Sequence, residues 1–217
     1  MNNLWEVQGW LYDTMFLLKP HAGLVQDVAG RLNPESRVLD AGCGSGRLAL
    51  DTSAQVIGCD FSSTMLRLAS QRESAVVQSS VLGELAFARE SFDEIVCINV
   101  LYALGYQYKQ ALDELYRVLR PGGRLYLANP VSERLVPLIT EHFQTASPRE
   151  IARSVVNLPR FAAWGLNLAR RGQFDASTFL FLSEEELVCA LQSAGFTIKS
   201  VEPTYAGIDR LVVAGKD

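Results

Sequence analysis

Two features that would place a protein in a membrane or on a secretory route are missing from this sequence of 217 residues. No run of about eighteen apolar residues is present, and a helix needs such a run to span a bilayer. The first residues, Met-Asn-Asn-Leu-Trp-Glu, lack the basic segment and apolar run of a secretory signal. We therefore expect a cytoplasmic protein without stable insertion into a membrane.

Cysteine and histidine are scarce, with four and two residues, respectively. The cysteines stand at positions 43, 59, 97 and 189, so no C-x-x-C pair exists. A zinc site needs closely spaced cysteine and histidine ligands, and this spacing does not supply them. Three of the cysteines fall in or beside expected buried strands, where a reduced cysteine acts as a small hydrophobic residue. The sequence predicts no metal site.

Basic residues are not in excess, since the formal net charge is −4. A dedicated nucleic-acid-binding protein usually carries a basic footprint. Hydrophobic residues make up 48% and charged residues 20% of the chain, which is typical of a globular domain. The composition therefore favours one globular domain, and the charge argues against a nucleic-acid partner.

What the sequence does contain is a glycine-rich turn at residues 37–47. The apolar pair before Asp40 predicts a buried strand, and Gly42, Gly44 and Gly46 then predict a tight turn on which a ligand can lie against the main chain. A short helix is expected from Arg47 to about Ser53. The dinucleotide fingerprint G-x-G-x-x-G fits poorly, because Arg47 occupies its sixth position. A nicotinamide-dependent oxidoreductase is therefore disfavoured.

Strand and helix patterns alternate after this turn. Apolar strands are expected at residues 55–59, 75–79, 91–99 and 124–128, and two further strands at 196–201 and 210–214. A helix over residues 108–119 has one apolar face, and Arg-Pro-Gly-Gly at 120–123 ends it because Pro cannot continue a helix. Asp60 and Asn99 each follow a strand, so we expect both at the edge where open α/β sheets bind ligands.

Two blocks of this sequence resemble the class I S-adenosylmethionine-dependent methyltransferases. One is Asp-x-Gly-x-Gly-x-Gly at residues 40–46, and the other is Glu-Leu-Tyr-Arg-Val-Leu-Arg-Pro-Gly-Gly-Arg-Leu-Tyr at 114–126. The resemblance implies an α/β fold with a Rossmann-like, seven-stranded, mostly parallel sheet whose last strand is antiparallel. It also implies helices on both faces, whereas the helical lid insertion expected in this chain lies outside the resemblance.

The same resemblance implies an enzyme that moves a methyl group from S-adenosyl-L-methionine to an O, N or C nucleophile by direct in-line displacement. The product of the cofactor would be S-adenosyl-L-homocysteine. Val-Leu follows Asn99, where methyltransferases of nucleic-acid bases and glutamine amides carry Pro-Pro-Tyr. This departure favours a small-molecule acceptor.

Cofactor contacts are also implied by the resemblance. The glycine turn would carry the methionine half, and the carboxylate of Asp60 would accept hydrogen bonds from the ribose hydroxyls. Where family members often place an acid near the adenine, this chain has Ser79, Ser80 and Val81. The expected cofactor-binding residues are Asp40, Gly42, Cys43, Gly44, Gly46, Asp60, Phe61, Met65, Ser80, Val81 and Asn99.

Four regions are expected along the chain. They are an N-terminal helical cap at 1–33, a cofactor-binding core at 34–130, a helical insertion at 131–182, and a last helix with a β-hairpin at 183–217. Capping boxes at residues 147–150 and 183–186 predict two helix starts. The insertion is read first as a lid over a substrate pocket, with a homodimer interface or a membrane-surface element as alternatives.

Candidate catalytic residues are fewer and rest on weaker patterns. The Tyr12–Asp13 pair is similar to a pair near the cofactor pocket of the quinone-biosynthesis methyltransferases. Tyr102 either orients the acceptor or belongs to the core, and His142 is the better placed of two histidines for a general base. The alternative function is a catalytically inactive cofactor-binding protein that acts as a partner-binding module.

Overall fold

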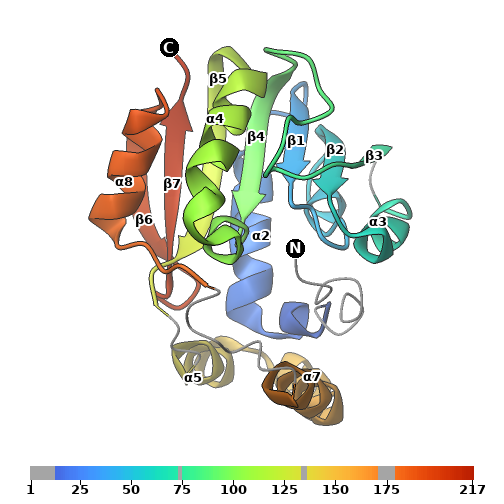
Figure 1. The fold of residues 1–217 in the computed structure, drawn as a ribbon. Helices are drawn as coiled ribbons and strands as arrows, with labels where there is room; N and C mark the ends of the chain where they lie inside the picture. Colours follow the sequence, from blue (N-terminus) through green and yellow to red (C-terminus); the bar gives the residue numbers. More distant parts are fainter. Residues whose placement is uncertain (1–12, 73–74, 133–135, 171–178) are drawn as a thin grey trace.

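Strands and helices that alternate along the sequence form one seven-stranded sheet (Figure 1). The computed structural model describes residues 13–72, 75–132, 136–170 and 179–217. The strands are β1 (Arg37–Ala41), β2 (Gln55–Asp60), β3 (Ala75–Gln78), β4 (Phe92–Ile98), β5 (Leu119–Pro130), β6 (Thr197–Thr204) and β7 (Asp209–Gly215). Their order is β3-β2-β1-β4-β5-β7-β6, and β7 is antiparallel to both of its neighbours. The expected fold class is confirmed, including the antiparallel last strand.

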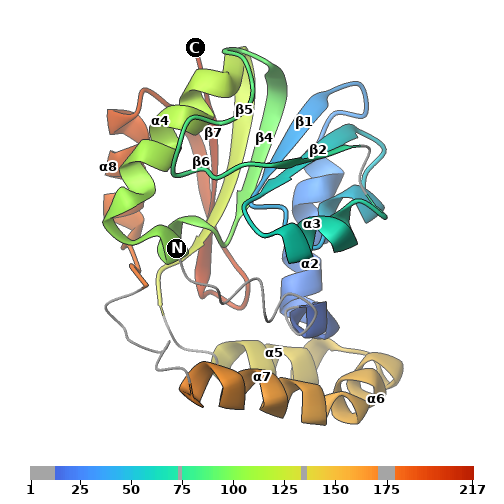
Figure 2. The same ribbon diagram turned by 45° about the vertical axis from the view of Figure 1, so that its right-hand side comes forward.

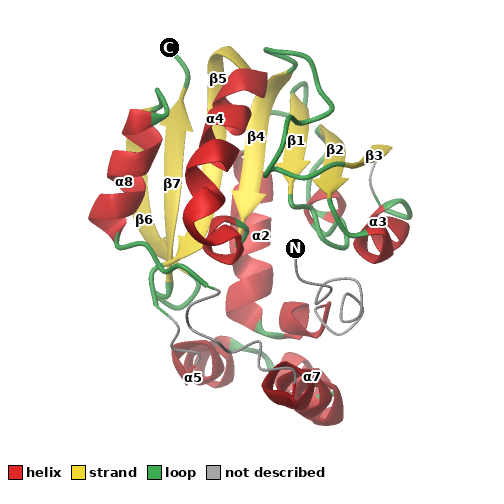
Figure 3. Cartoon of the chain, viewed as in Figure 1, coloured by secondary structure: helices red, strands yellow, loops and turns green. Residues whose placement is uncertain are grey.

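Helices cover both faces of this sheet (Figures 1 and 3). The helical elements are η1 (Asp13–Leu17), α2 (Lys19–Arg31), η2 (Leu48–Leu50), α3 (Ser63–Ala69), η3 (Leu101–Gln107), α4 (Tyr108–Val118), α5 (Val136–Thr145), α6 (Pro148–Val156), α7 (Leu158–Arg170) and α8 (Glu184–Ser193). Helices α4 and α8 lie on one face of the sheet and α2 lies on the other (Figure 1).

The core is divided by the sheet into two main clusters. Leu39 packs with residues of α4 and α8, whereas its neighbour Val38 packs with residues of α2. Both side chains are fully buried, as expected for an inner strand of a sheet covered on both faces. The apolar pair before Asp40 therefore anchors the glycine turn from both sides.

The parallel strands all end at one edge, and the helices of the insertion lie beyond that edge (Figure 2). We call α5, α6 and α7 the insertion helices. The capping boxes predicted at Ser147 and Ser183 are confirmed, each with the serine and the glutamate three residues later bonded to the backbone. Helix α6 ends at Val156, and Pro159 stands at the second position of α7, where the missing N–H of proline costs nothing. That the insertion acts as a lid stays a prediction.

Two further expectations differ from the structure. The helix expected from Arg47 to Ser53 is reduced to the single 3-10 turn η2, because only eight residues separate Gly46 from β2 at Gln55. The expected apolar face of α5 is only partly buried. Leu138 and His142 are covered, whereas Ile139 and Phe143 are 51% and 52% exposed.

Candidate functional site

The glycine turn leaves β1 with a backbone that only glycine adopts easily. Gly42, Gly44 and Gly46 have φ values of 77°, 53° and 75°. A Cβ on Gly42 would lie 2.3 Å from Cγ2 of Val100, whereas a Cβ on Gly44 would meet no atom within 4 Å. Gly42 therefore serves close packing against the end of β4, and Gly44 borders open space that a ligand can enter.

Hydrogen bonds to β2 hold the turn in place. The N–H groups of Gly42 and Cys43 donate to the carbonyl oxygen of Cys59 at 2.7 and 3.0 Å. The N–H of Gly44 donates to Oδ2 of Asp60 at 3.0 Å, and the N–H of Ser62 donates to Oδ1 at 2.8 Å. Both carboxylate oxygens of Asp60 therefore hold the backbone beside the turn, and a contact of this carboxylate with ribose hydroxyls stays a prediction.

Asp40 lies beneath the turn and is 6% exposed. Burial, and then the negative charge of Asp60, raise the pKa of Asp40 to about 7. The structure therefore brings together two of the predicted acids, Asp40 and Asp60, at the ends of adjacent strands. Their mutual repulsion favours a ligand that supplies positive charge or hydrogen-bond donors nearby.

Further residues expected to bind the cofactor follow β2 and β3 along the chain. The carbonyl oxygen of Phe61 accepts a hydrogen bond from Nε2 of Gln78, and the hydroxyl oxygen of Ser80 accepts one from the N–H of Leu82. Met65 and Val81 are buried in the core, and Cys43 packs against Leu66 in a small cluster beside them. That these residues contact the adenine stays a prediction.

A clamp that the sequence did not reveal joins the N-terminal element η1 to the glycine turn. The Asp13 carboxylate accepts a hydrogen bond from the hydroxyl of Ser45 and pairs with Nη2 of Arg72 at 3.2 Å. Nη1 of Arg72 donates to the carbonyl oxygen of Ser45 at 2.6 Å. Asp13 belongs to the predicted Tyr12–Asp13 pair, whereas Arg72 is part of no motif recognised in the sequence. Tyr12 itself lies outside the described residues.

Asp209 is the second residue that sequence reasoning missed. It begins β7 opposite Pro130 of β5 and is fully buried. Neither carboxylate oxygen makes a hydrogen bond of ordinary geometry within the described residues. Burial raises the pKa of Asp209 to about 8, while the neighbouring Asn99 amide and Arg210 oppose this rise. A fully buried acid without a counter-ion is costly for the fold, so it is a candidate functional group.

Asn99 and Tyr102, both predicted from the sequence, lie near Asp209. Asn99 adopts a φ of 56°, uncommon for a residue other than glycine, at the end of β4. The Tyr102 ring stacks on Phe179, with 5.3 Å between centroids. Burial and the charge of Asp209 raise the pKa of Tyr102 to about 12, so the phenol stays protonated. The structure thus brings together an amide, a phenol and an acid at the carboxyl edge of the sheet.

His142 occupies a structural position in the insertion helices. Its Nδ1 accepts a hydrogen bond from the N–H of Lys19 at 3.1 Å, and its Nε2 contacts the hydroxyl of Ser154 at 2.9 Å. Burial lowers the pKa of His142, so the ring is neutral. Both ring nitrogens are therefore engaged in linking α5 to α2 and α6. This geometry favours a structural role over the catalytic role predicted for it.

The residues present fit S-adenosylmethionine, because open space borders Gly44 and an acid stands beside it at the end of β2. Fold and site together define a class I S-adenosylmethionine-dependent methyltransferase. A family model described as "Methyltransferase domain" matches residues 39–127, and this segment of the chain belongs to that family.

Curated relatives support the class but differ in acceptor. The chain is 37% identical over 91 residues to a tRNA (carboxymethyluridine(34)-5-O)-methyltransferase of Arabidopsis thaliana, a match that covers 41% of this chain and 22% of that protein. It is 32% identical over 117 residues to the ubiquinone/menaquinone biosynthesis C-methyltransferase of Geotalea daltonii, covering 48% of this chain and 49% of that protein. The matches thus span about a fifth and about half of these relatives.

Solved structures share the fold at low identity. A Thermotoga maritima methyltransferase, described as a possible histamine N-methyltransferase, has a TM-score of 0.67 at 19% identity, with both chains covered completely. A Burkholderia thailandensis 1,6-didemethyltoxoflavin-N1-methyltransferase, solved with its substrate and S-adenosylhomocysteine, has a TM-score of 0.58 at 20% identity over 93% of this chain and 79% of that one. In the described part of this chain, no helix is long and apolar enough to cross a membrane.

Proposed function

We propose that this chain transfers a methyl group from S-adenosylmethionine to a small-molecule acceptor by direct in-line displacement. The observation that carries the proposal is the glycine turn at residues 40–46 held against Asp60, with open space at Gly44. In this proposal the turn holds the methionine half and Asp60 holds the ribose. The adenine lies toward Phe61, Met65, Ser80 and Val81.

When bound, the cofactor supplies an electrophilic methyl group on a sulfonium, and the enzyme mainly has to align a nucleophile behind it. Asn99 and Tyr102 are proposed to orient the acceptor, because both stand at the carboxyl edge of the sheet. The Tyr102 phenol is protonated and can donate a hydrogen bond to an acceptor oxygen or nitrogen. Tyr12 stays a candidate for the same task on the basis of the resemblance alone.

Asp209 is proposed as the group that takes the proton of the acceptor. With a pKa near 8, its carboxylate is a stronger base than an ordinary aspartate and is populated at mildly alkaline pH. As the acceptor heteroatom bonds to the methyl carbon, its O–H or N–H proton would pass to a carboxylate oxygen of Asp209. An acceptor with an ionisable O–H or N–H group is therefore favoured.

The insertion helices are proposed to cover the acceptor, since they lie beyond the carboxyl edge of the sheet (Figure 2). Exposed apolar side chains on them, among them Ile139 and Phe143, suit a partly apolar acceptor or a homodimer contact. Three buried free cysteines, at positions 43, 59 and 97, fit a cytoplasmic location. A catalytically inactive binding module stays the alternative.

A tRNA acceptor is the second candidate function, favoured by the match to a tRNA methyltransferase. The net charge of −4 weighs against it, because tRNA binding usually needs a basic surface.

The deciding experiment incubates the protein with S-adenosylmethionine and either a panel of phenols, enols and amines or total tRNA. S-adenosylhomocysteine is quantified by mass spectrometry. We expect formation that depends on a small-molecule acceptor and is lost in Asp209→Asn. Turnover with tRNA alone would establish the second candidate, and no turnover with any acceptor would favour the inactive module.

A further inference from the structure

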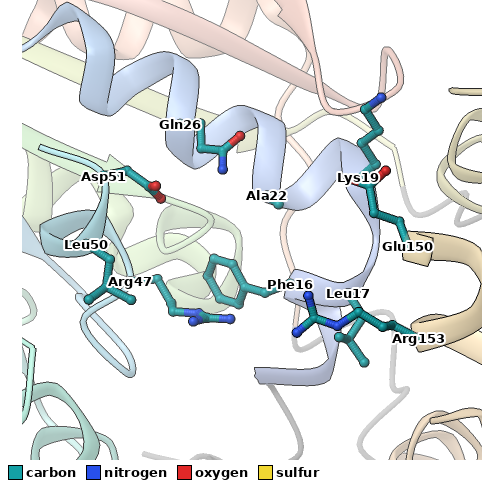
Figure 4. A pocket seen from close by; sticks show the side chains of 10 residues that line it. All are labelled: Phe16, Leu17, Lys19, Ala22, Gln26, Arg47, Leu50, Asp51, Glu150 and Arg153. Atoms are coloured by element: carbon teal, nitrogen blue, oxygen red, sulfur yellow. The ribbon is translucent and has the colours of Figure 1, made fainter. Parts of the chain in front are cut away.

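A cavity of about 340 Å³ lies behind the glycine turn, between η1, α2, η2 and α6 (Figure 4). Its apolar wall includes Phe16, Leu17 and Leu50, and its polar wall includes Arg47 and Arg153. Its volume is at the lower end of the range for small-molecule sites. None of the residues predicted to contact the cofactor lines it.

Arg47 enters this cavity from the exit of the glycine turn, directly after Gly46. Its guanidinium carbon stands 4.7 Å from the centroid of the Phe16 ring. Its Nε is buried and has no hydrogen-bond partner within the described residues. A buried donor left without a partner is costly, because the group loses its water without gaining a replacement.

Arg153 enters the same cavity from the opposite side, on α6. Figure 4 shows its guanidinium group pointing toward Phe16, as that of Arg47 does. The described residues supply no ion pair to either arginine. Two guanidinium groups in the lining of one cavity, the one on Arg153 also exposed to solvent, make that cavity positive and favour an anion in it.

The other charged residues that line the cavity do not neutralise Arg47 and Arg153. The Glu150 carboxylate is engaged in the capping box of α6 and stands near Lys19. Asp51 lies on the other side of the cavity, toward Gln26 and away from both guanidinium groups (Figure 4). The acids therefore do not occupy the space between Arg47 and Arg153.

From these contacts we propose a second ligand site, in which Arg47 and Arg153 bind the phosphate or carboxylate group of a small organic anion. Guanidinium groups bind both kinds of anion through paired hydrogen bonds. The apolar part of the ligand packs against Phe16, Leu17 and Leu50. Because Arg47 belongs to the turn and Arg153 to an insertion helix, the bound anion links the two. The proposal goes beyond the methyl-transfer function and does not depend on it.

The test is calorimetric titration of the whole chain with phenyl phosphate and, in a second arm, with benzoate, at constant low ionic strength. Each titration is repeated with saturating S-adenosylmethionine. The variants are Arg47→Gln and Arg153→Gln. Arg149→Gln is the matched control, because Arg149 is an exposed arginine of the same helix that does not line the cavity. Thermal unfolding of each variant without ligand reports whether it is folded.

We expect saturable binding of at least one probe with a Kd below about 1 mM. Affinity should fall about tenfold or more in Arg47→Gln and Arg153→Gln and stay unchanged in Arg149→Gln, as loss of a charge-assisted hydrogen bond implies. Binding should persist with S-adenosylmethionine present. The proposal is overturned by no saturable binding to the wild type, by equal affinity in the folded variants, or by competition between probe and cofactor.

Discussion

The backbone N–H of Gly44 donates a hydrogen bond to Oδ2 of Asp60 over 3.0 Å, and this contact joins the glycine turn after β1 to the end of β2. The two features of the sequence that imply a cofactor, twenty positions apart at Asp40 and Asp60, thus meet in space. Because the contact uses a backbone N–H, its geometry depends on the positive φ of Gly44. The shape of the turn and the position of the acid are therefore linked.

Replacement of Gly44 by alanine separates the conformational role of the glycine from its role beside a ligand. Both Gly44 and Gly122 have positive φ and open space around them, so Gly44→Ala and Gly122→Ala should each lower the free energy of unfolding by about 1 kcal/mol. Only Gly44→Ala should also weaken S-adenosylmethionine binding, by about tenfold or more, because its methyl group enters the ligand space. Urea unfolding and calorimetry measure the two effects. Equal cofactor affinity in both variants would remove Gly44 from the site.

The clamp between η1 and the glycine turn should matter more for cofactor binding than for stability. Asp13 and Arg72 are partly exposed, so their pair should stabilise the fold by only about 0.5 to 1 kcal/mol in a double-mutant cycle. Arg72→Gln should nevertheless weaken cofactor binding severalfold, because Arg72 also holds the Ser45 carbonyl of the turn. Arg67→Gln on the preceding helix α3 is the control, since the guanidinium of Arg67 bonds to Thr64 of its own helix. Identical affinities for the two variants would contradict the clamp.

The raised pKa of Asp209 predicts that the free energy of unfolding falls as pH rises. Its folded-state pKa is raised to about 8, so its favourable contribution is complete below the unfolded pKa near 4 and is lost as pH rises through 8. Between pH 6 and pH 9 the wild type should therefore lose roughly 2 to 3 kcal/mol that Asp209→Asn keeps. Urea unfolding of both proteins at the two pH values measures this. Asp51→Asn changes an exposed acid and is the control, so its free energy of unfolding should fall between pH 6 and pH 9 by the same amount as that of the wild type. If Asp209→Asn also loses this stability, Asp209 is not the cause of the loss.

His142 gives a prediction that distinguishes a structural from a catalytic role. His142→Ala removes two hydrogen bonds and a buried ring, so it should lower the free energy of unfolding by about 2 to 4 kcal/mol. The folded variant should retain methyl-transfer activity within a few-fold of the wild type at low temperature. Loss of activity without loss of stability would restore His142 as a catalytic residue.

Sequence reasoning predicted the succession of strands and the cofactor end of the site because both depend on local patterns. Asp40, Gly44 and Asp60 follow apolar strands at fixed spacing, and parallel strands end at one edge whatever the rest of the chain does. The acceptor end could not be predicted in the same way. Asp209 becomes buried only because β7 pairs in antiparallel register with β5, which places it opposite Pro130. The available signal was an acid standing just before the apolar run of the last strand.

Arg72 and His142 show two other limits of the sequence. Arg72 reaches the glycine turn across 27 residues from the end of α3, and an isolated arginine in an irregular segment has no pattern that predicts such a contact. His142 was predicted as a candidate base because it lies in the helical insertion. The bonds to Lys19 and Ser154 that engage its ring depend on how α5 packs against α2 and α6.

The central claim is that Asp60 and the glycine turn hold S-adenosylmethionine, and calorimetric titration of the wild type, Asp60→Asn and Asp51→Asn tests it most directly. Asparagine keeps the size of the side chain but replaces one acceptor oxygen with a donor group. We expect S-adenosylmethionine to bind the wild type saturably, to bind Asp60→Asn at least about tenfold more weakly, and to bind Asp51→Asn with wild-type affinity. No binding to the wild type, or equal affinity in all three proteins, would contradict it.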